Sequence, residues 1–356
     1  MKIKRKKTRR IYVGRVAVGG GAPVAVQSMT KTQTPDAAAT LEQIGRLDRA
    51  GCEIVRVAVP DKRSLKSFKQ IKECSPLPVV ADIHFLPELA LGALDAGADC
   101  VRVNPGNMGG AVGFRDVART AARLGRSVRI GVNAGSLEPK LAKNNKMLLS
   151  DKLVRSALVY AEAAEKAGLM DYKLSLKASD VTATVDAYRQ VSKLTDAPLH
   201  VGVTEAGCAF SGAIKSGVGI GILLAEGIGD TIRVSMSEEP EVEVRAAWEI
   251  LRALDIRRRG VEVISCPTCS RTTVDVGAVA EEIGRASVDI TQPVRVAVMG
   301  CEVNGPGESK GADLALVMDR KGFARIYVHG EPVRRVSAAK SVREIVSEMI
   351  KMTEKI

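Results

Sequence analysis

One unit repeats through residues 24–236 of this chain: an apolar strand, a loop and an alanine-rich amphipathic helix. The eight segments interpreted as strands are Val24–Met29, Ile54–Val59, Val79–Ile83, Cys100–Asn104, Val128–Asn133, Tyr172–Lys177, Leu199–Thr204 and Thr231–Met236. Helices are predicted between them, for example at Ala37–Ala50, Leu89–Ala96 and Leu153–Ala167. An Ala-Gly pair at the end of each of these three helices is typical of a glycine C-cap. Eight strands alternating with helices predict an α/β fold of the TIM (β/α)8 barrel type.

An open doubly wound sheet is the alternative for such a repeat. A dinucleotide-binding sheet of that type needs Gly-x-Gly-x-x-Gly directly after its first strand, and nothing of the kind follows Met29. Gly19, Gly20 and Gly21 precede the first strand, where they are interpreted as a structural turn. Aromatic residues make up only 3% of the chain, which suits a βα repeat built from small, interlocking side chains. The barrel is therefore favoured.

A smaller α/β domain is predicted after the repeat, since 356 residues are long for one domain. A last barrel helix is expected at Glu241–Leu254, and the Arg-Arg-Arg-Gly run at residues 257–260 resembles a linker. The rest gives, in chain order, a strand, a Cys-x-x-Cys motif, a helix, a strand, a loop with Cys301, strands at Leu314–Asp319 and Phe323–His329, and a final helix. We predict a substrate-binding barrel at residues 1–256 and a cluster-binding α/β domain at residues 257–356.

Three cysteines of the second domain have the pattern of a metal centre. Cys266 and Cys269 are three positions apart, so both thiolates can face one centre, and Cys301 follows a second strand. Three thiolates with an open or weakly held fourth position are typical of a reactive iron–sulfur cluster. The Asn-Gly-Pro-Gly loop at residues 304–307 suits a cofactor pressed against main chain, because glycine permits close approach. A thioredoxin-like redox motif and a zinc site are the alternatives. A zinc ribbon, however, requires a second cysteine close to Cys301, and the sequence has none there.

The distribution of charge, the apolar segments and the cysteines indicate which partners and which cellular compartment to expect. The formal net charge is +12, but seven positive charges lie within the first ten residues. A basic tail is more often solvated than functional, and aromatic residues are scarce, so we predict no nucleic-acid binding. No apolar stretch is long enough for a membrane span, and no apolar core follows the basic N-terminus as in a signal peptide. Seven scattered cysteines in a chain too large to need disulfides favour a reducing cytoplasm.

Arginine recurs on four of the predicted barrel strands. Because side chains alternate along a strand, each polar residue shares a face with the residue two or four positions on. The resulting pairs are Asp82 with His84, Arg102 with Asn104, Arg129 with Asn133, Lys173 with Lys177, and Arg233 with Ser235; Arg56 lies on a further strand. Functional residues of TIM barrels lie at the C-terminal ends of the strands. Because the apolar neighbours on the opposite face pack against the helices, the side chains of this polar set are predicted to point into the barrel mouth.

Burying an arginine without an anionic partner is unfavourable in free energy, because the charge loses its hydration. Asp82 and Glu205 can neutralise two of them at most, so the others are predicted to bind a phosphate or diphosphate, which guanidinium groups contact bidentately. An internal salt-bridge network is the alternative for any single arginine. Glu205, at a strand end, is a candidate general acid or positioning group. His84 is a weaker candidate, because a lone histidine is more often packed than catalytic.

Nine motifs of the chain, in order, resemble those of one family. They lie at residues 11–14 (IYVG), 26–30 (VQSMT), 81–85 (ADIHF), 102–107 (RVNPGN), 131–137 (GVNAGSL), 177–180 (KASD), 204–207 (TEAG), 266–271 (CPTCSR) and 304–308 (NGPGE). On these motifs the chain resembles, nearly end to end, the 4-hydroxy-3-methylbut-2-enyl diphosphate synthase family of the non-mevalonate isoprenoid pathway, in its short bacterial form.

The resemblance implies a reductase that acts on 2-C-methyl-D-erythritol 2,4-cyclodiphosphate. Two electrons open the ring, and the C3 oxygen leaves as water. The resemblance implies a [4Fe-4S] cluster on Cys266, Cys269 and Cys301, with Glu308 as a displaceable fourth ligand. It makes Glu205 the expected proton donor near C3. The residues that match substrate contacts are Arg56, Arg102, Asn104, Arg129, Asn133, Lys177 and Arg233; Asp82, His84 and Ser235 complete the candidate substrate-binding set.

The resemblance also implies partners. Electrons are expected from reduced flavodoxin or ferredoxin, and a head-to-tail homodimer is expected in which the cluster domain of one subunit caps the barrel of the other. Cys208 stands where smaller residues are expected and could compete as a cluster ligand. The compact loops at residues 309–311 and 319–322 leave the choice of donor open. The competing hypotheses are a phosphate-binding TIM-barrel lyase or isomerase with a structural zinc domain, and a non-enzymatic iron-responsive protein that binds nucleic acid through its basic tail.

Overall fold

The computed structural model describes residues 3–108, 110–272 and 274–354. Its internal contacts divide the chain into two compact units, Met1–Arg257 and Arg258–Ile356. Across the described residues, no helix has both the length and the apolar character needed to cross a membrane.

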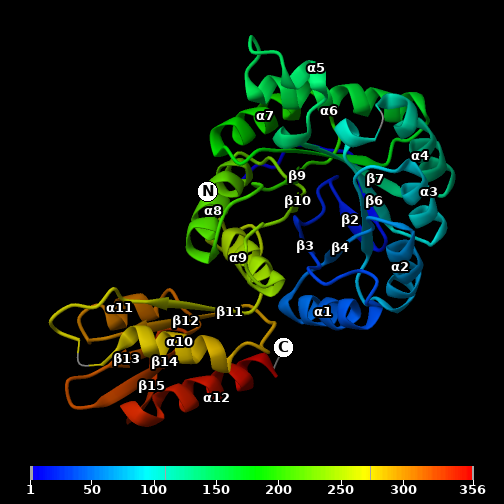
Figure 1. The fold of residues 1–356 in the computed structure, drawn as a ribbon. Coiled ribbons are helices and arrows are strands. Elements are labelled where there is room, and N and C mark those ends of the chain that lie inside the picture. Colours follow the sequence, from blue (N-terminus) through cyan, green and yellow to red (C-terminus); the bar gives the residue numbers. More distant parts are fainter. Residues whose placement is uncertain (1–2, 109, 273, 355–356) are drawn as a thin grey trace. The chain divides into compact units, whose positions relative to one another are not determined.

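The first unit contains a parallel barrel of eight strands, so the predicted fold class is confirmed (Figure 1). The strand order is β8-β7-β6-β5-β4-β3-β10-β9, and a bridge between Leu174 and Leu199 joins the two ends. The strands are β3 (Ala25–Met29), β4 (Ile54–Ala58), β5 (Val79–Ile83), β6 (Cys100–Val103), β7 (Ser127–Asn133), β8 (Tyr172–Lys177), β9 (His200–Val201) and β10 (Thr231–Ile232).

The last two barrel strands are shorter than the six residues predicted for each. Beyond Val201 and Ile232 the chain keeps single hydrogen bonds to its neighbours, such as Arg233 N to Val201 O at 3.0 Å and Thr204 N to Ala178 O at 3.3 Å. The regular ladder stops there. Glycine at position 202 and a left-handed φ of 53° at Glu205 interrupt the extended backbone that a ladder requires.

Helices surround the barrel (Figure 1). They are α1 (Ala37–Ala50), α2 (Lys62–Cys74), α3 (Pro87–Asp95), α4 (Ala111–Arg123), α5 (Pro139–Ala142), α6 (Leu149–Lys166), α7 (Val181–Leu194), α8 (Ala209–Ala225) and α9 (Pro240–Ala253). The glycines that follow α1, α3 and α6 have φ values of 94°, 89° and 82°, as the predicted glycine caps require. Aspartates at positions 36, 61 and 180 cap α1, α2 and α7 by accepting from backbone N–H groups of the first turn.

A hairpin closes the N-terminal end of the barrel. Its strands are β1 (Ile11–Val13) and β2 (Val16–Val18), and its apolar side chains pack with Ala25, Ile54 and Val80 in one buried cluster. The basic tail before the hairpin is also bound to the barrel. Arg5 pairs with Asp230 at 2.9 Å, and the Arg9 guanidinium lies 4.4 Å from the centroid of the Tyr172 ring. The expectation of a solvated tail is wrong for these two residues, because buried acceptors and an aromatic face at the barrel bottom hold them.

The second unit is a five-stranded mixed sheet in the order β11-β12-β13-β14-β15. Its elements are β11 (Val261–Ser265), α10 (Val276–Ala286), β12 (Val294–Met299), α11 (Gly305–Ser309), β13 (Leu314–Met318), β14 (Phe323–Val328), β15 (Glu331–Ser337) and α12 (Ser341–Thr353). The first three strands are parallel and the last two antiparallel. Helices α10 and α12 contribute Val276, Ile283, Ile345 and Met349 to the core on one face of this sheet.

Strand β15 was not predicted from the sequence. It is an edge strand that carries Pro332, Arg334 and Arg335, and most of its residues are exposed. An edge strand needs no apolar alternation, and charged residues and proline are common there. The hydrophobic periodicity that indicates the other strands is therefore missing from this one.

Candidate functional site

The barrel register stacks the inward-facing side chains in layers. In a closed barrel each layer takes one residue from every second strand. Following the observed pairing around the barrel places Arg56, Arg102, Ser175 and Arg233 at one height. The next layer toward the C-terminal mouth holds Met29, Asp82, Gly131 and Gly202. We call the first of these the arginine layer.

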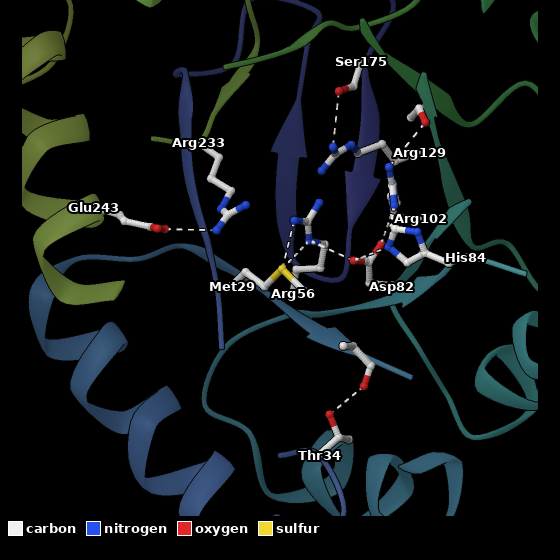
Figure 2. Close-up of polar contacts among 12 residues, drawn as sticks. Met29, Thr34, Arg56, Asp82, His84, Arg102, Arg129, Ser175, Arg233 and Glu243 are labelled. Carbon is white, nitrogen blue, oxygen red and sulfur yellow. Dashed lines mark hydrogen bonds and ion pairs between the residues drawn. The ribbon is translucent and has the colours of Figure 1, made fainter. Parts of the chain in front are cut away.

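Asp82 pairs with arginines on the two neighbouring strands and lies beside His84 (Figure 2). Its carboxylate lies 3.1 Å from Arg102 Nη1, 3.7 Å from Arg56 Nε and 3.4 Å from His84 Nε2. Burial raises the pKa of this carboxyl, but the charges of Arg56 and Arg102 outweigh it and hold the pKa well below its usual value. Asp82 is therefore a carboxylate that two guanidinium groups share.

Arg56 and Arg129 lie deep in the barrel with few partners (Figure 2). Arg56 places Nη2 2.9 Å from the sulfur of Met29, and burial lowers its pKa to about 10. Arg129 donates from Nη2 to Ser175 Oγ at 3.2 Å, whereas its Nε and Nη1 have no hydrogen-bond partner among the described residues. Burial, followed by repulsion from Arg56 and Arg102, lowers the pKa of Arg129 well below its ordinary value. Arg56 shares Asp82 with Arg102, whereas no carboxylate of the described residues pairs with Arg129.

Arg233 has a partner that the sequence reasoning missed. Glu243, in the first turn of α9, accepts from Arg233 Nη2 at 3.2 Å and from the backbone N–H of Met236 at 3.0 Å, and it lies 3.5 Å from Lys31 Nζ (Figure 2). Its position on the buried face of α9, beside Pro240 and Val244, was the available signal, since an acid on an apolar helix face needs a buried partner.

Glu205 does not neutralise any of these arginines, contrary to the expectation. It is exposed in the loop between β9 and α8, and no ion pair is found for it within the described residues. Within the described part of the chain, the carboxylates that contact the set are Asp82 and Glu243. These carboxylates are outnumbered by the buried or half-buried basic side chains of the set, which are Arg56, Arg102, Arg129, Lys173, Lys177 and Arg233.

Lys177 and two asparagines complete the mouth. Lys177 is buried, and desolvation and then the charges of Arg129 and Arg233 lower its pKa well below the ordinary value. Asn104 donates from Nδ2 to Ser136 Oγ at 2.6 Å, and its Oδ1 is unpaired among the described groups. With its amide oxygen turned toward Arg102, Asn133 accepts from Nη2 at 3.1 Å. Ser235 follows β10 and is half-buried.

Two inward-facing glycines make room for these cations. A Cβ atom at Gly131 would lie 2.6 Å from Arg102 Nε, and one at Gly202 would lie 2.5 Å from Lys177 Nζ. Real Cβ atoms essentially never approach so closely, so any larger residue would displace the cationic side chain. The layer above the arginine layer is thus open enough for long basic side chains to enter the mouth.

Replacing Glu243 with glutamine tests the buried pair on Arg233. The substitution keeps the shape but removes the charge that faces Arg233 and Lys31. We expect the free energy of unfolding to fall by about 1.5–3 kcal/mol, the usual contribution of a hydrogen bond to a charged group. Chemical denaturation measures it. Glu241→Gln is the matched control on the same helix: its pair with Arg46 is more exposed and should contribute only about 0.2–1 kcal/mol. Equal losses in the two variants would contradict the role of Glu243.

In the second unit, two of the three candidate cysteines follow adjacent parallel strands. Cys266 comes after β11 and Cys301 after β12, and Ser265 pairs with Val298 between these strands. The N–H of Gly300 donates to Cys266 Sγ at 3.2 Å. Cys269 is exposed in the loop after Cys266. Sequence spacing thus identified cysteines that the sheet brings to one edge.

The surroundings of Cys301 favour its thiolate. Hydrogen bonds from the backbone N–H groups of Val303 and Asn304 lower the pKa of the thiol, and Arg271 acts in the same direction. Glu308 is exposed on the short helix α11. Cys208 belongs to the barrel unit, where it is exposed at the N-cap of α8.

The thiol groups at this edge are a donor set that fits an iron–sulfur cluster. Among the described residues, no three His, Cys, Asp or Glu side chains gather around the position of one ion. A zinc site requires that convergence. In a four-iron cluster each cysteine binds a different iron, so the thiolates stand further apart. Backbone N–H groups directed at the sulfur atoms, as at Cys266 and Cys301, are a common means of tuning such clusters.

Comparisons with known proteins cover nearly the whole chain. The family profile described as the GcpE TIM-barrel domain matches residues 8–248, and that of the GcpE protein C-terminal domain matches residues 262–351. A protein of Aquifex aeolicus named 4-hydroxy-3-methylbut-2-en-1-yl diphosphate synthase (flavodoxin) is 48% identical over 350 residues, 98% of both chains. One of the same name from Geobacter sulfurreducens is 49% identical over 346 residues, 97% of this chain and 98% of the relative.

Among solved structures, the dihydropteroate synthase of Yersinia pestis is similar to the barrel. It has a TM-score of 0.50 and 13% sequence identity, and the match covers 69% of this chain and 97% of that one. At this identity the similarity shows the barrel fold alone.

Proposed function

This chain belongs to the GcpE family, and on that premise we propose that it reduces 2-C-methyl-D-erythritol 2,4-cyclodiphosphate to 4-hydroxy-3-methylbut-2-enyl diphosphate. The reaction consumes two electrons, opens the ring and releases the C3 oxygen as water. It is a step of the non-mevalonate route to isoprenoids. The observation that carries the proposal is the excess of cations over carboxylates inside the barrel mouth.

The barrel residues would bind the diphosphate. Arg56, Arg102 and Arg233 lie in one layer, and Lys177 lies above them toward the mouth. Since Asp82 and Glu243 are the only carboxylates of the described residues that contact this set, a dianionic or trianionic ligand would relieve the remaining repulsion. Guanidinium groups contact phosphate oxygens bidentately, which also fixes the orientation of the ring. Asn104 and Asn133 could orient the remaining ring oxygens.

The cysteine edge of the second unit would hold the redox cofactor. We propose Cys266, Cys269 and Cys301 as ligands of a [4Fe-4S] cluster, with Glu308 as the fourth. Such a cluster would supply electrons one at a time. The N–H group of Gly300 would donate to the sulfur of Cys266, and the N–H groups of Val303 and Asn304 would stabilise the thiolate form of Cys301. The relatives named for flavodoxin favour flavodoxin as the electron donor.

Glu205 would provide a proton for the departing C3 oxygen. It is one of few non-glycine residues with a left-handed φ, and it stands in the loop directly after the barrel strand β9. Backbone strain of this kind clusters at functional sites, where the surrounding fold over-determines it.

A homodimer is proposed on the basis of an exposed apolar stripe on α8. Phe210, Ile214, Val218 and Ile222 recur at every fourth position of this helix and are exposed. This spacing places them in one row along the helix surface. A contiguous exposed apolar row on a folded protein is typical of a protein–protein contact, and we propose a second copy of this chain as its partner.

Replacing Ile214 with aspartate should convert the dimer to a monomer. The substitution places a charge in the centre of the apolar stripe, where association would bury it without a partner. Light scattering coupled to size-exclusion chromatography reports the mass in solution. Val159→Asp on α6 is the matched control, because Val159 is similarly exposed but lies outside the stripe. A dimer that survives Ile214→Asp would rule out this interface.

The proposed reaction is tested with anaerobically purified protein, the cyclodiphosphate and reduced methyl viologen as electron donor. We expect phosphorus-31 NMR to show loss of the cyclic diphosphate and appearance of a linear diphosphate ester only when reductant is present. Conversion without reductant would instead indicate a lyase or isomerase. No conversion by protein that contains the full complement of iron and sulfide would contradict the proposed substrate.

A further inference from the structure

A group of buried polar side chains lies beneath the arginine layer, and most of it has no part in the proposed reaction. None of the following atoms has a hydrogen-bond partner among the described residues: both amide atoms of Gln27, Lys173 Nζ, both ring nitrogens of His200, Thr231 Oγ1, and Nε and Nη1 of Arg129. All five side chains are at most 2% exposed. Polar groups so deeply buried are almost always hydrogen-bonded, so these atoms require a partner that the chain itself does not provide.

The barrel register brings these residues together. Gln27, Arg129 and His200 belong to the layer directly below the arginine layer, and Lys173 and Thr231 belong to the next one down. The pKa shifts agree with this placement of the residues. The charges of Arg129 and Lys173 each lower the pKa of His200, and the charge of Arg129 lowers the pKa of Lys173. Core layers of a TIM barrel are usually filled with Val, Ile and Leu. Here two adjacent layers carry a group of polar side chains on β3 and β7–β10.

The charges of this group are not balanced by the chain. Burial and the nearby cations lower the pKa of His200 well below its ordinary value, which leaves the ring neutral. Arg129 and Lys173 are the cations. The carboxylate that most favours a charged Lys173 is Asp230, but Asp230 is bound by Arg5 and by the N–H of Leu199. A buried cation without a counter-charge either loses its proton or recruits an anion. A guanidinium cannot lose its proton in this way.

The available atoms are mainly hydrogen-bond donors. Lys173 Nζ, Arg129 Nε and Nη1, the Thr231 hydroxyl and the Gln27 amide nitrogen can all donate. We propose that the barrel core beneath the arginine layer binds one small monovalent anion, of halide size, between Lys173, Arg129 and Thr231. Water could satisfy the hydrogen bonds but would leave both charges uncompensated. The hairpin cluster closes the barrel on the N-terminal side, so the ion enters from the mouth.

Bromide tests this site, because its anomalous scattering distinguishes it from water in crystals of the full chain. Crystals are grown with bromide and with inorganic pyrophosphate, which competes for the arginine layer. We expect one anomalous peak beside Lys173 and Thr231 in the wild type and none in Lys173→Met. An ordered water at this position, or bromide found only among Arg56, Arg102 and Arg233, would overturn the proposal.

Solution stability provides a second measurement that does not depend on crystals. An anion that binds only the folded protein raises the denaturation midpoint with its concentration. We expect the midpoint to rise when bromide replaces gluconate at constant ionic strength, and the rise to be lost in Lys173→Met and reduced in Thr231→Val, which removes one donor at nearly constant volume. Lys69→Met, at an exposed position of α2, is the control and should keep the full response. The same bromide response in both core variants would refute the site. The outcome is independent of turnover, so it leaves the proposed reaction untouched.

Discussion

Replacing Cys301 with serine is expected to lower reductive turnover to the background rate and to remove the iron–sulfur cluster from the protein. Cys301 is the cysteine of the proposed ligand set that follows a different strand than the Cys266-x-x-Cys269 motif. The hydroxyl of serine is far less acidic than a thiol and binds iron of a cluster poorly, so the third attachment point is lost. Iron and acid-labile sulfide per chain, together with the visible absorption of anaerobically purified protein, measure the effect directly.

Two other cysteines serve as controls for Cys301. Cys74 and Cys208 are exposed thiols of the barrel unit, and their serine variants should keep the iron, the sulfide and the activity of the wild type. The Cys208 variant also answers whether that thiol competes as a ligand. Wild-type sulfide content in Cys301→Ser would refute the assignment of Cys301, whereas lost sulfide in Cys208→Ser would bring Cys208 into the ligand set.

Replacing Asp82 with asparagine is expected to destabilise the fold strongly. Removing one partner of a buried ion pair typically costs about 3–5 kcal/mol, because the remaining charge stays buried. Here the carboxylate serves two arginines, and the surrounding barrel already has an excess of cations. Urea denaturation at neutral pH measures the loss. An anion that binds the arginines, such as pyrophosphate, should restore more stability to Asp82→Asn than to the wild type.

Asp82 also predicts how stability depends on pH. Its folded-state pKa lies well below the ordinary value, so its contribution is fully present above the unfolded pKa of about 4 and is lost as the pH falls toward the folded pKa. The free energy of unfolding of Asp82→Asn should lack this acid-dependent contribution. Asp95→Asn, at an exposed position of α3, is the control and should change stability by no more than about 0.5 kcal/mol. Equal stabilities of Asp82→Asn and the control would show that Asp82 does not hold the arginines.

Much of the barrel could be predicted from local sequence. Helix ends are marked by residues such as Gly51 and Gly168, whose left-handed backbone few other residues adopt. Buried parallel strands such as β5 are mostly apolar, and four of its five residues are Val, Ala or Ile. Both signals depend on a few neighbouring residues. Edge strand β15 is polar and mostly exposed, and it therefore carries no such signal.

The candidate site was predictable only in part. Strand parity identified the inward-facing arginines, because alternation is a local property. Their counter-charges are set by tertiary structure: Arg233 pairs with Glu243 on the following helix, and Glu205, the candidate expected from its strand-end position, stays exposed. The space that Gly131 and Gly202 leave for Arg102 and Lys177 also depends on register around the barrel. Tertiary pairing decides these features, and no short stretch of sequence encodes it.

The most direct test of the central claim is the number of electrons consumed per molecule of product. Reduced flavodoxin is titrated into anaerobic enzyme with the cyclodiphosphate, and oxidised flavodoxin and 4-hydroxy-3-methylbut-2-enyl diphosphate are quantified in the same samples. A two-electron reduction predicts two one-electron oxidations of flavodoxin for each product molecule, and no product without reductant. Product formed without oxidation of flavodoxin, or flavodoxin oxidised with no diphosphate product, would contradict the account.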